Sequence, residues 1–113
     1  MKLVLAYIRP RKRDAVVDRL RQMRVPGVSL STVDGFGLEA DASGTTSYGI
    51  QPSPYTQVVR VEAVCTDERA TAIAEAIAES AQTGRRGDGK VFVLPVHRAI
   101  DIRAHNTDMD ALQ

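Results

Sequence analysis

The sequence predicts an α+β fold whose elements follow the order β-α-β-β-α-β, and three observations support this prediction. The chain of 113 residues has room for one compact domain, 1–113, with a single core. Two segments carry apolar residues at helical spacing, and each lies between segments with strand patterns. A loop over about 38–57, rich in Gly, Ser and Pro, separates the second strand from the third and is long enough to indicate a function.

The first half of the chain is expected to form a strand, a helix and a second strand. Residues 3–8 are apolar on both alternating faces, which is typical of a strand covered on both sides or lying at an interface. Pro10 marks a helix start, and Pro26 with Gly27 ends that helix. Its buried stripe would be Val16, Val17, Leu20 and Met23. Residues 28–36 alternate and predict the second strand.

The second half repeats this order. Residues 58–65 are rich in β-branched side chains and predict a third strand. Thr66 is the expected N-cap of a second helix that Gly84 ends. The buried stripe of this helix would be Ala70, Ile73, Ala74, Ile77 and Ala81. Residues 91–96 predict a fourth strand, and 99–103 a short fifth one.

This order of elements is the ferredoxin-like arrangement, in which both helices cover one face of a four-stranded antiparallel sheet. The other sheet face carries apolar and mixed side chains from the first and third strands. Left uncovered, these side chains would form an exposed patch, so we expect the chain to form an oligomer.

Composition excludes several classes of function. The net charge of +1, with both signs interspersed, does not suggest a nucleic-acid partner. The apolar stretches are far shorter than the roughly 20 residues that cross a bilayer, and the start shows no signal-peptide cleavage site, so we expect a cytoplasmic protein without membrane insertion. The single cysteine, Cys65, falls in an apolar strand and is expected to be a buried packing residue.

The turn from Thr83 to Lys90 carries the densest chemical signal. Its three glycines allow backbone N–H groups to approach an anion, and its cations suit phosphate oxygens. The pattern resembles a P-loop but fails at Val91, where a Ser or Thr would hold Mg²⁺, and the turn joins helix to strand instead of strand to helix. A helix-ending turn with solvated arginines has the same composition, so the turn alone does not establish phosphate binding.

The chain resembles the nitrogen-regulatory PII signalling family along nearly its whole length. The resemblance rests on Asp34-Gly35-Phe36-Gly37, on Ala81-Gln82-Thr83-Gly84 followed by residues 87–93, and on residues 100–103. It implies a homotrimer that binds an adenine nucleotide (ATP, ADP or AMP) between subunits and controls a target protein, with a membrane transporter as one candidate. It also implies a T-loop at about 38–57, a B-loop at about 83–90 and a C-loop with tail at about 97–113.

The resemblance also implies the residues of the nucleotide site. Gly87, Asp88, Gly89 and Lys90 would cradle the phosphates. Gly35 and Gly37 would line the cleft, and Arg103 would approach from the neighbouring subunit. Ser29, Glu62 and Val64 would surround the adenine and the ribose. Each also has an ordinary structural reading, and their joint occurrence favours the functional one.

The chain departs from the family pattern at several positions. Leu38 replaces an arginine that the family pattern places at the triphosphate site, and Glu39 and Val58 replace a glutamine and a lysine that serve 2-oxoglutarate and its Mg²⁺. A carboxylate at about 4 Å from that ligand would repel it by about 4 kcal/mol at an effective dielectric near 20, so we expect no 2-oxoglutarate sensing. Gln51 replaces a tyrosine that is uridylylated in some members, and Asp101 replaces an arginine aimed at the phosphates.

Other functions remain open at this point. Similar losses occur in PII-like proteins that respond to inorganic carbon, which makes bicarbonate a candidate second ligand beside Mg²⁺. Glu39 is a candidate metal ligand, and His97, His105, Asp108 and Asp110 could belong to a metal-binding trimer. A slow nucleotide hydrolase is a further alternative, but no nucleophile and base are evidently paired, so we do not expect an enzyme or a catalytic cofactor.

Overall fold

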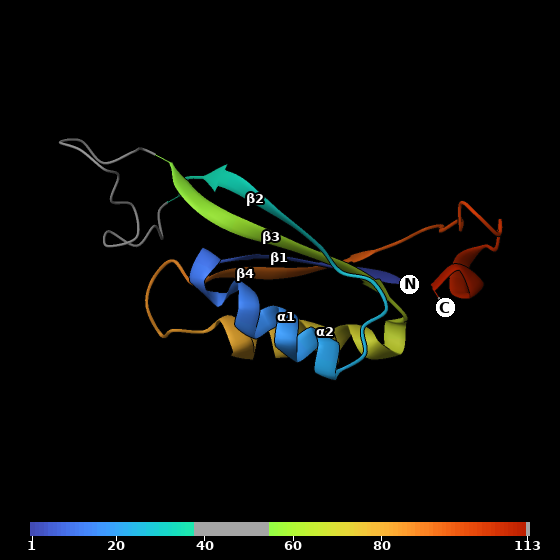
Figure 1. Cartoon of the computed structure of the whole chain (residues 1–113), viewed down its shortest axis with the longest axis horizontal. Helices are drawn as coiled ribbons and strands as arrows, with labels where there is room; N and C mark the ends of the chain where they lie inside the picture. Colours follow the sequence, from blue (N-terminus) through green and yellow to red (C-terminus); the bar gives the residue numbers. More distant parts are fainter. Residues whose placement is uncertain (38–54, 113) are drawn as a thin grey trace.

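The computed structural model describes residues 1–37 and 55–112, which form an antiparallel sheet with two helices on one face (Figure 1). The four strands lie in the order β2-β3-β1-β4. With η marking a 3-10 helix, the elements are β1 (Lys2–Ile8), η1 (Pro10–Lys12), α1 (Arg13–Gln22), β2 (Ser29–Gly35), β3 (Thr56–Cys65), α2 (Asp67–Ala81), β4 (Gly89–Pro95) and η2 (Asp108–Leu112). The predicted ferredoxin-like fold is therefore confirmed.

The two faces of the sheet differ in burial, as the alternating residues of the central strand β1 show. Val4, Ala6 and Ile8 are buried beneath the helices, and β3 adds Val59 and Val61 to the same core. The alternate residues of β1 point to the other face, which neither helix α1 nor helix α2 covers. This surface, called the open face below, consists of Leu3, Leu5 and Tyr7 with their partners Arg60, Glu62 and Val64 on β3 and Lys90, Phe92 and Leu94 on β4.

Cys65 is a packing residue, as its sequence context predicts. It is the last residue of β3, it is buried, and it belongs to the main hydrophobic cluster. Burial in apolar surroundings raises the pKa of its thiol, and the positive charges of Arg69 and the N-terminus only partly offset this effect. A buried thiol with a raised pKa is a poor nucleophile.

The end of the first helix differs from the prediction. The α-helix begins at Arg13, after the 3-10 turn that contains Pro10, and it ends well before Pro26. Arg24 adopts a left-handed conformation with φ of 56°, and the backbone N–H of Val25 donates to the carbonyl of Leu20 at 3.1 Å. These features form a Schellman motif, which satisfies the last carbonyls of the helix without a glycine.

Three further expectations need correction. The stripe of α2 buries Ala76, whereas Ala74 is only partly covered, because the helix presents a slightly rotated face to the sheet. The helix ends at Ala81, since Gln82 is already extended. Residues 99–103 do not form a fifth strand: Ile100 makes one isolated bridge to Thr107, and the chain turns between them.

Candidate functional site

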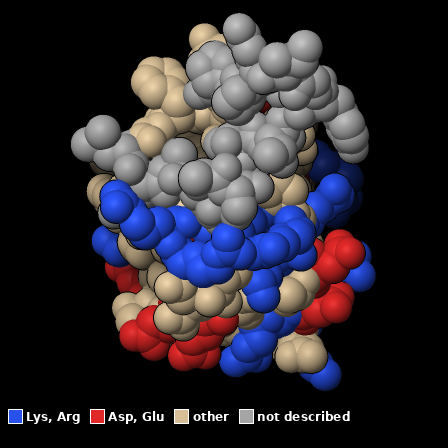
Figure 2. All heavy atoms as spheres, turned by 90° about the vertical axis from the view of Figure 1, so that its left-hand side faces the viewer, with Lys and Arg blue, Asp and Glu red and all other residues tan. Residues whose placement is uncertain are grey.

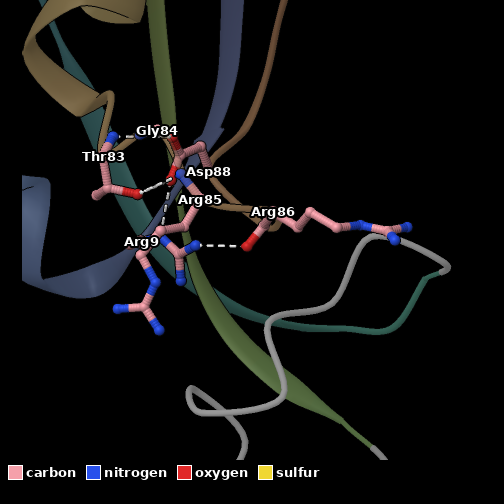
Figure 3. Close-up of polar contacts among 6 residues, drawn as sticks. All are labelled: Arg9, Thr83, Gly84, Arg85, Arg86 and Asp88. Carbon is pink, nitrogen blue, oxygen red and sulfur yellow. Dashed lines mark hydrogen bonds and ion pairs between the residues drawn. The ribbon is translucent and has the colours of Figure 1, made fainter.

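Asp88 organises the turn between α2 and β4 (Figure 3). Its Oδ2 accepts hydrogen bonds from the backbone N–H groups of Thr83 at 2.8 Å and Gly84 at 2.9 Å. Its Oδ1 accepts from the hydroxyl of Thr83 and, at 3.0 Å, from Nε of Arg9. Arg9 also donates from Nη2 to the carbonyl of Arg86 at 2.6 Å. The carboxylate therefore ties both ends of the turn to the end of β1.

These hydrogen bonds hold the pKa of Asp88 well below its usual range. The hydroxyl of Thr83 has the largest effect, and it outweighs the desolvation that would raise the pKa. The backbone N–H of Thr83, the side chain of Arg9 and the backbone N–H of Gly84 lower the pKa further. The side chain of Asp88 is thus engaged by donors of the turn, so any contact of this residue with a phosphate would involve its backbone.

The glycines of the turn have conformations that other residues rarely adopt. Gly84, Gly87 and Gly89 have φ values of 83°, 92° and 104°. At Gly89 the backbone also approaches β1 closely, since a Cβ there would lie 1.8 Å from the carbonyl oxygen of Tyr7. Glycines in such conformations allow a backbone to approach an anion closely, although the N–H of Gly84 already donates to Asp88.

Cations surround this turn. Lys90 follows Gly89 on β4, lies opposite Tyr7 and has an exposed side chain on the open face. Figure 2 shows Lys and Arg side chains gathered in a band across this end of the molecule. The elements at this end contribute Arg9, Arg11, Lys12, Arg85, Arg86 and Lys90. The positive band therefore lies at the end of the molecule that carries this turn.

Gly35 and Gly37 lie at the same end of the sheet but at its opposite edge. Gly35 ends β2, whereas Gly89 begins β4, and β3 and β1 lie between these strands. Three strand-to-strand steps of about 4.8 Å place the two glycine bends at least about 14 Å apart. One phosphate cannot contact both bends of a single chain, so the predicted cleft between them requires a second subunit.

Ser29, Glu62 and Val64 lie close together at the other end of the sheet. Ser29 lies directly opposite Glu62, and Val64 lies two residues further along β3 on the same face. Nε of Arg60 lies 2.9 Å from Oε1 of Glu62, an ion-pair distance that does not meet hydrogen-bond geometry.

The same three residues line a hollow of about 470 Å³. The remaining lining residues are Leu3, Pro26, Gly27, Ala63, Ala111 and Leu112. The sequence did not predict that Ala111 and Leu112 belong here, because the tail has neither a strand nor a helix pattern that would fix its direction. A hollow of this volume lies within the range of ordinary ligand pockets.

Arg103 lies in a turn of the tail that Asp101 stabilises. Oδ1 of Asp101 accepts hydrogen bonds from the backbone N–H groups of Arg103 at 3.0 Å and Ala104 at 2.9 Å. The backbone N–H of Asp101 donates to the carbonyl of Asn106 at 2.8 Å, and the carbonyl of Asp101 accepts from the backbone N–H of His105 at 2.8 Å. The acidic residue that replaces an expected arginine therefore has a structural role, which is to hold the turn that carries Arg103.

Several predicted residues lie outside the described part of the chain, namely Leu38, Glu39 and Gln51. Val58 is described; it is half-buried and lies opposite Val33 on the open face. Thr56 and Gln57 belong to β3 although they fall within the range predicted for the long loop. Residue 58, where the family pattern has a lysine, is therefore an uncharged strand residue in this chain.

Neither a metal cluster nor a membrane-spanning helix is found among residues 1–37 and 55–112. His97, His105, Asp108 and Asp110 are not gathered into a group that could hold a metal ion. No described helix is long and apolar enough to cross a bilayer. Asp108 instead closes the tail, because its Oδ1 accepts from the backbone N–H of Ala99 at 3.2 Å.

Comparisons with known proteins agree with these observations. The family model for nitrogen regulatory protein P-II matches residues 1–106. A nitrogen regulatory protein P-II from Rhizobium meliloti (strain 1021) is 38% identical over 112 residues, which cover 99% of this chain and 100% of the relative. Nitrogen regulatory protein GlnK2 from Haloferax mediterranei is also 38% identical over 112 residues, covering 99% of this chain and 91% of the relative.

Proposed function

Because the chain belongs to the PII nitrogen regulatory family, whose members are non-enzymatic signal transducers, we propose that it senses an adenine nucleotide bound between the subunits of a homotrimer. The family binds adenine nucleotides as effectors and acts on target proteins. In this chain the segment of about 38–57 would contact the target, and a transporter in the membrane is the candidate target of a protein that itself stays in the cytoplasm. A nucleotide that prefers one state of this segment shifts its population.

The observation that carries this proposal is the construction of the turn before β4. Asp88 satisfies the donors at the start of the turn, and Gly87, Gly89 and Lys90 follow in the part of the turn that would meet the phosphates. Gly87 and Gly89 would bring backbone donors close to that anion, and the cations at this end would supply charge-assisted hydrogen bonds. The hollow beside Ser29, Glu62 and Val64 accommodates an uncharged group of ligand size.

The separation of these two regions supports a shared site between subunits. The phosphate-binding turn and the hollow lie at opposite edges of one sheet. The open face exposes Phe92 and Leu94, whose side chains are 45% and 39% accessible. Packing of open faces in a trimer would bury these side chains and bring the turn of one subunit toward the hollow of the next.

Isothermal titration of the purified chain with ATP, ADP and AMP tests this function. We expect saturable binding of at least one nucleotide, and Lys90→Ala should weaken the binding of ATP and ADP by roughly 10- to 100-fold because a charge-assisted hydrogen bond is lost. Lys2→Ala is a matched control, since it removes the same charge at the far end of β1. Wild-type protein that binds none of the three at millimolar concentrations would exclude the proposal.

We propose that 2-oxoglutarate is not an effector of this chain. The half-buried side chain of Val58 offers no positive charge to a dicarboxylate, and Glu39 adds a negative one. Titration of 2-oxoglutarate into the complex with ATP and Mg²⁺ should give no heat beyond dilution. Micromolar binding in that titration would contradict the proposal. Bicarbonate in place of 2-oxoglutarate tests the remaining candidate for a second ligand.

Regulation by uridylylation is also not proposed for this chain, since Gln51 provides no phenolic oxygen. The nearby Tyr55 follows the undescribed segment, and its ring contacts Phe36 edge to face at 6.1 Å. Mass spectrometry of the native protein should find no uridylyl group on the peptide that contains position 51. A uridylylated peptide from this segment would show that another tyrosine has taken over the role.

A further inference from the structure

The hollow beside β2 and β3 has two walls that come from distant parts of the sequence. Leu3 and Val64, which lie opposite each other on β1 and β3, form part of the wall on the sheet. Ala111 and Leu112 at the end of η2 line the hollow as well, and both are partly buried. The space between sheet and tail therefore has apolar sides, which suit the faces of a flat heteroaromatic ring.

The charges around the hollow select the uncharged part of a nucleotide. The described residues that line it include no Lys or Arg, and Glu62 contributes a carboxylate. Glu62 is paired with Arg60, so the lining residues leave no cation for a phosphate, whereas the edge of a base offers donors to Glu62 and to the hydroxyl of Ser29. The hollow is thus complementary to the base, just as the turn at Lys90 is complementary to the phosphates.

The tail that supplies the second wall is held together by its own hydrogen bonds. The backbone N–H of Asp108 donates to the carbonyl of Ala99 at 2.7 Å, and Ile100 bridges to Thr107. The backbone N–H of Asp110 donates to Thr107 at 3.2 Å. Figure 1 shows this folded tail beyond the end of the sheet that is opposite the phosphate-binding turn. Ala111 and Leu112 are therefore presented by a preformed unit.

We propose that Leu112, supported by Ala111, forms the outer wall of the base pocket and packs against the adenine of the bound nucleotide. This inference rests on the proposed nucleotide-binding function and assigns the tail a distinct part in it. The tail contributes to the binding of the base, which all adenine nucleotides share, and the turn at Lys90 contributes to the binding of the phosphates, in which they differ.

Titration of ATP, ADP and AMP into the Leu112→Ser variant tests whether the tail binds the base while the turn at Lys90 binds the phosphates. Loss of the apolar contact should weaken the binding of all three nucleotides by the same factor, about tenfold, and leave their order of affinity unchanged. Lys90→Ala should instead weaken ATP and ADP more than AMP. Leu112→Met keeps the apolar volume and should restore binding to within about threefold of the wild type.

Met109→Ser is the matched control, because Met109 belongs to the same 3-10 helix, is 49% exposed and is not among the residues that line the hollow. Circular dichroism and the molar mass in solution establish that each variant is folded and assembled like the wild type. The inference would be overturned if Leu112→Ser bound all three nucleotides within twofold of the wild type, or if it lost no more affinity than Met109→Ser. In either case the proposed nucleotide binding would still hold. Absence of binding by the wild type would overturn the proposed function and this inference together.

Discussion

Gly89→Ala is expected to destabilise the folded chain by about 3 kcal/mol or more. The new Cβ would lie 1.8 Å from the carbonyl oxygen of Tyr7 and 2.9 Å from its carbonyl carbon. Both contacts are with backbone in the middle of the sheet, so no side-chain rotation relieves them. The φ of 104° adds strain for any residue with a Cβ. Denaturant unfolding followed by circular dichroism measures the loss.

Two other glycines provide graded controls for this variant. Gly84 has a φ of 83° but nothing within 4 Å of its Cβ position, so Gly84→Ala should cost only the strain, roughly 1 kcal/mol. Gly27 has neither a positive φ nor a close neighbour, and Gly27→Ala should be close to neutral. If Gly89→Ala were as stable as Gly27→Ala, the close approach of β4 to β1 would be wrong.

Asp88→Asn should destabilise the chain by roughly 2 to 3 kcal/mol at neutral pH, which is the cost of losing hydrogen bonds to a charged group. The amide keeps the shape of the side chain but places an NH₂ group where Oδ1 or Oδ2 now accepts hydrogen bonds from Thr83 or Gly84. It also removes the charge that pairs with Arg9. Urea unfolding of the two proteins measures the difference.

The pH dependence of this difference provides an independent check. The pKa of Asp88 is lower in the folded chain than in the unfolded chain. Its contribution is therefore complete above the unfolded pKa of about 3.9 and is lost as the pH falls through that value toward the folded pKa. The stabilities of wild type and Asp88→Asn should converge between about pH 4 and pH 2. A difference that stays constant over this range would show that it comes from the NH₂ group facing the donors of the turn and not from the charge of Asp88.

The order of the elements could be predicted from the sequence because each strand and helix has a clear hydrophobic period. Val4, Ala6 and Ile8 on one face of β1 and Ile73 and Ile77 on α2 form the core, as the pattern indicates. Such periodicity reports which face is buried, and it fixes the fold when loops are short. The predicted strands accordingly differ from the observed ones by only one or two residues at their ends, apart from the expected fifth strand.

The details that escaped prediction depend on backbone geometry and long-range contacts. The first helix is closed by Arg24, which adopts a left-handed conformation where sequence rules favour glycine. Because Arg24 gives no such signal, the sequence predicts the helix end at Pro26 and Gly27 instead. Leu112 lines the same hollow as Val64 because hydrogen bonds of Asp108 and Thr107 set the path of the tail. No local period encodes that path.

The sequence predicts only in part which site residues lie together. The family resemblance predicts only that Ser29 and Glu62 belong to one site, and the strand register that places them opposite each other comes from the structure. The family resemblance predicts that Asp88 helps to bind the phosphates, whereas in the structure its carboxylate accepts hydrogen bonds from its own turn. A carboxylate in a Gly-rich turn is ambiguous because the sequence does not show which N–H groups point inward.

The edge strand β4 has a consequence for the newly synthesised chain. Phe92, Val93 and Leu94 are adjacent, strand-forming and substantially exposed, and they lie on the strand whose outer edge has no neighbour among the described elements. Such a segment is a template for aggregation until it is covered. If the chain assembles as the proposed trimer, the interval between release from the ribosome and assembly is the period in which this strand is most exposed to aggregation. Rapid assembly would protect the chain as effectively as folding does.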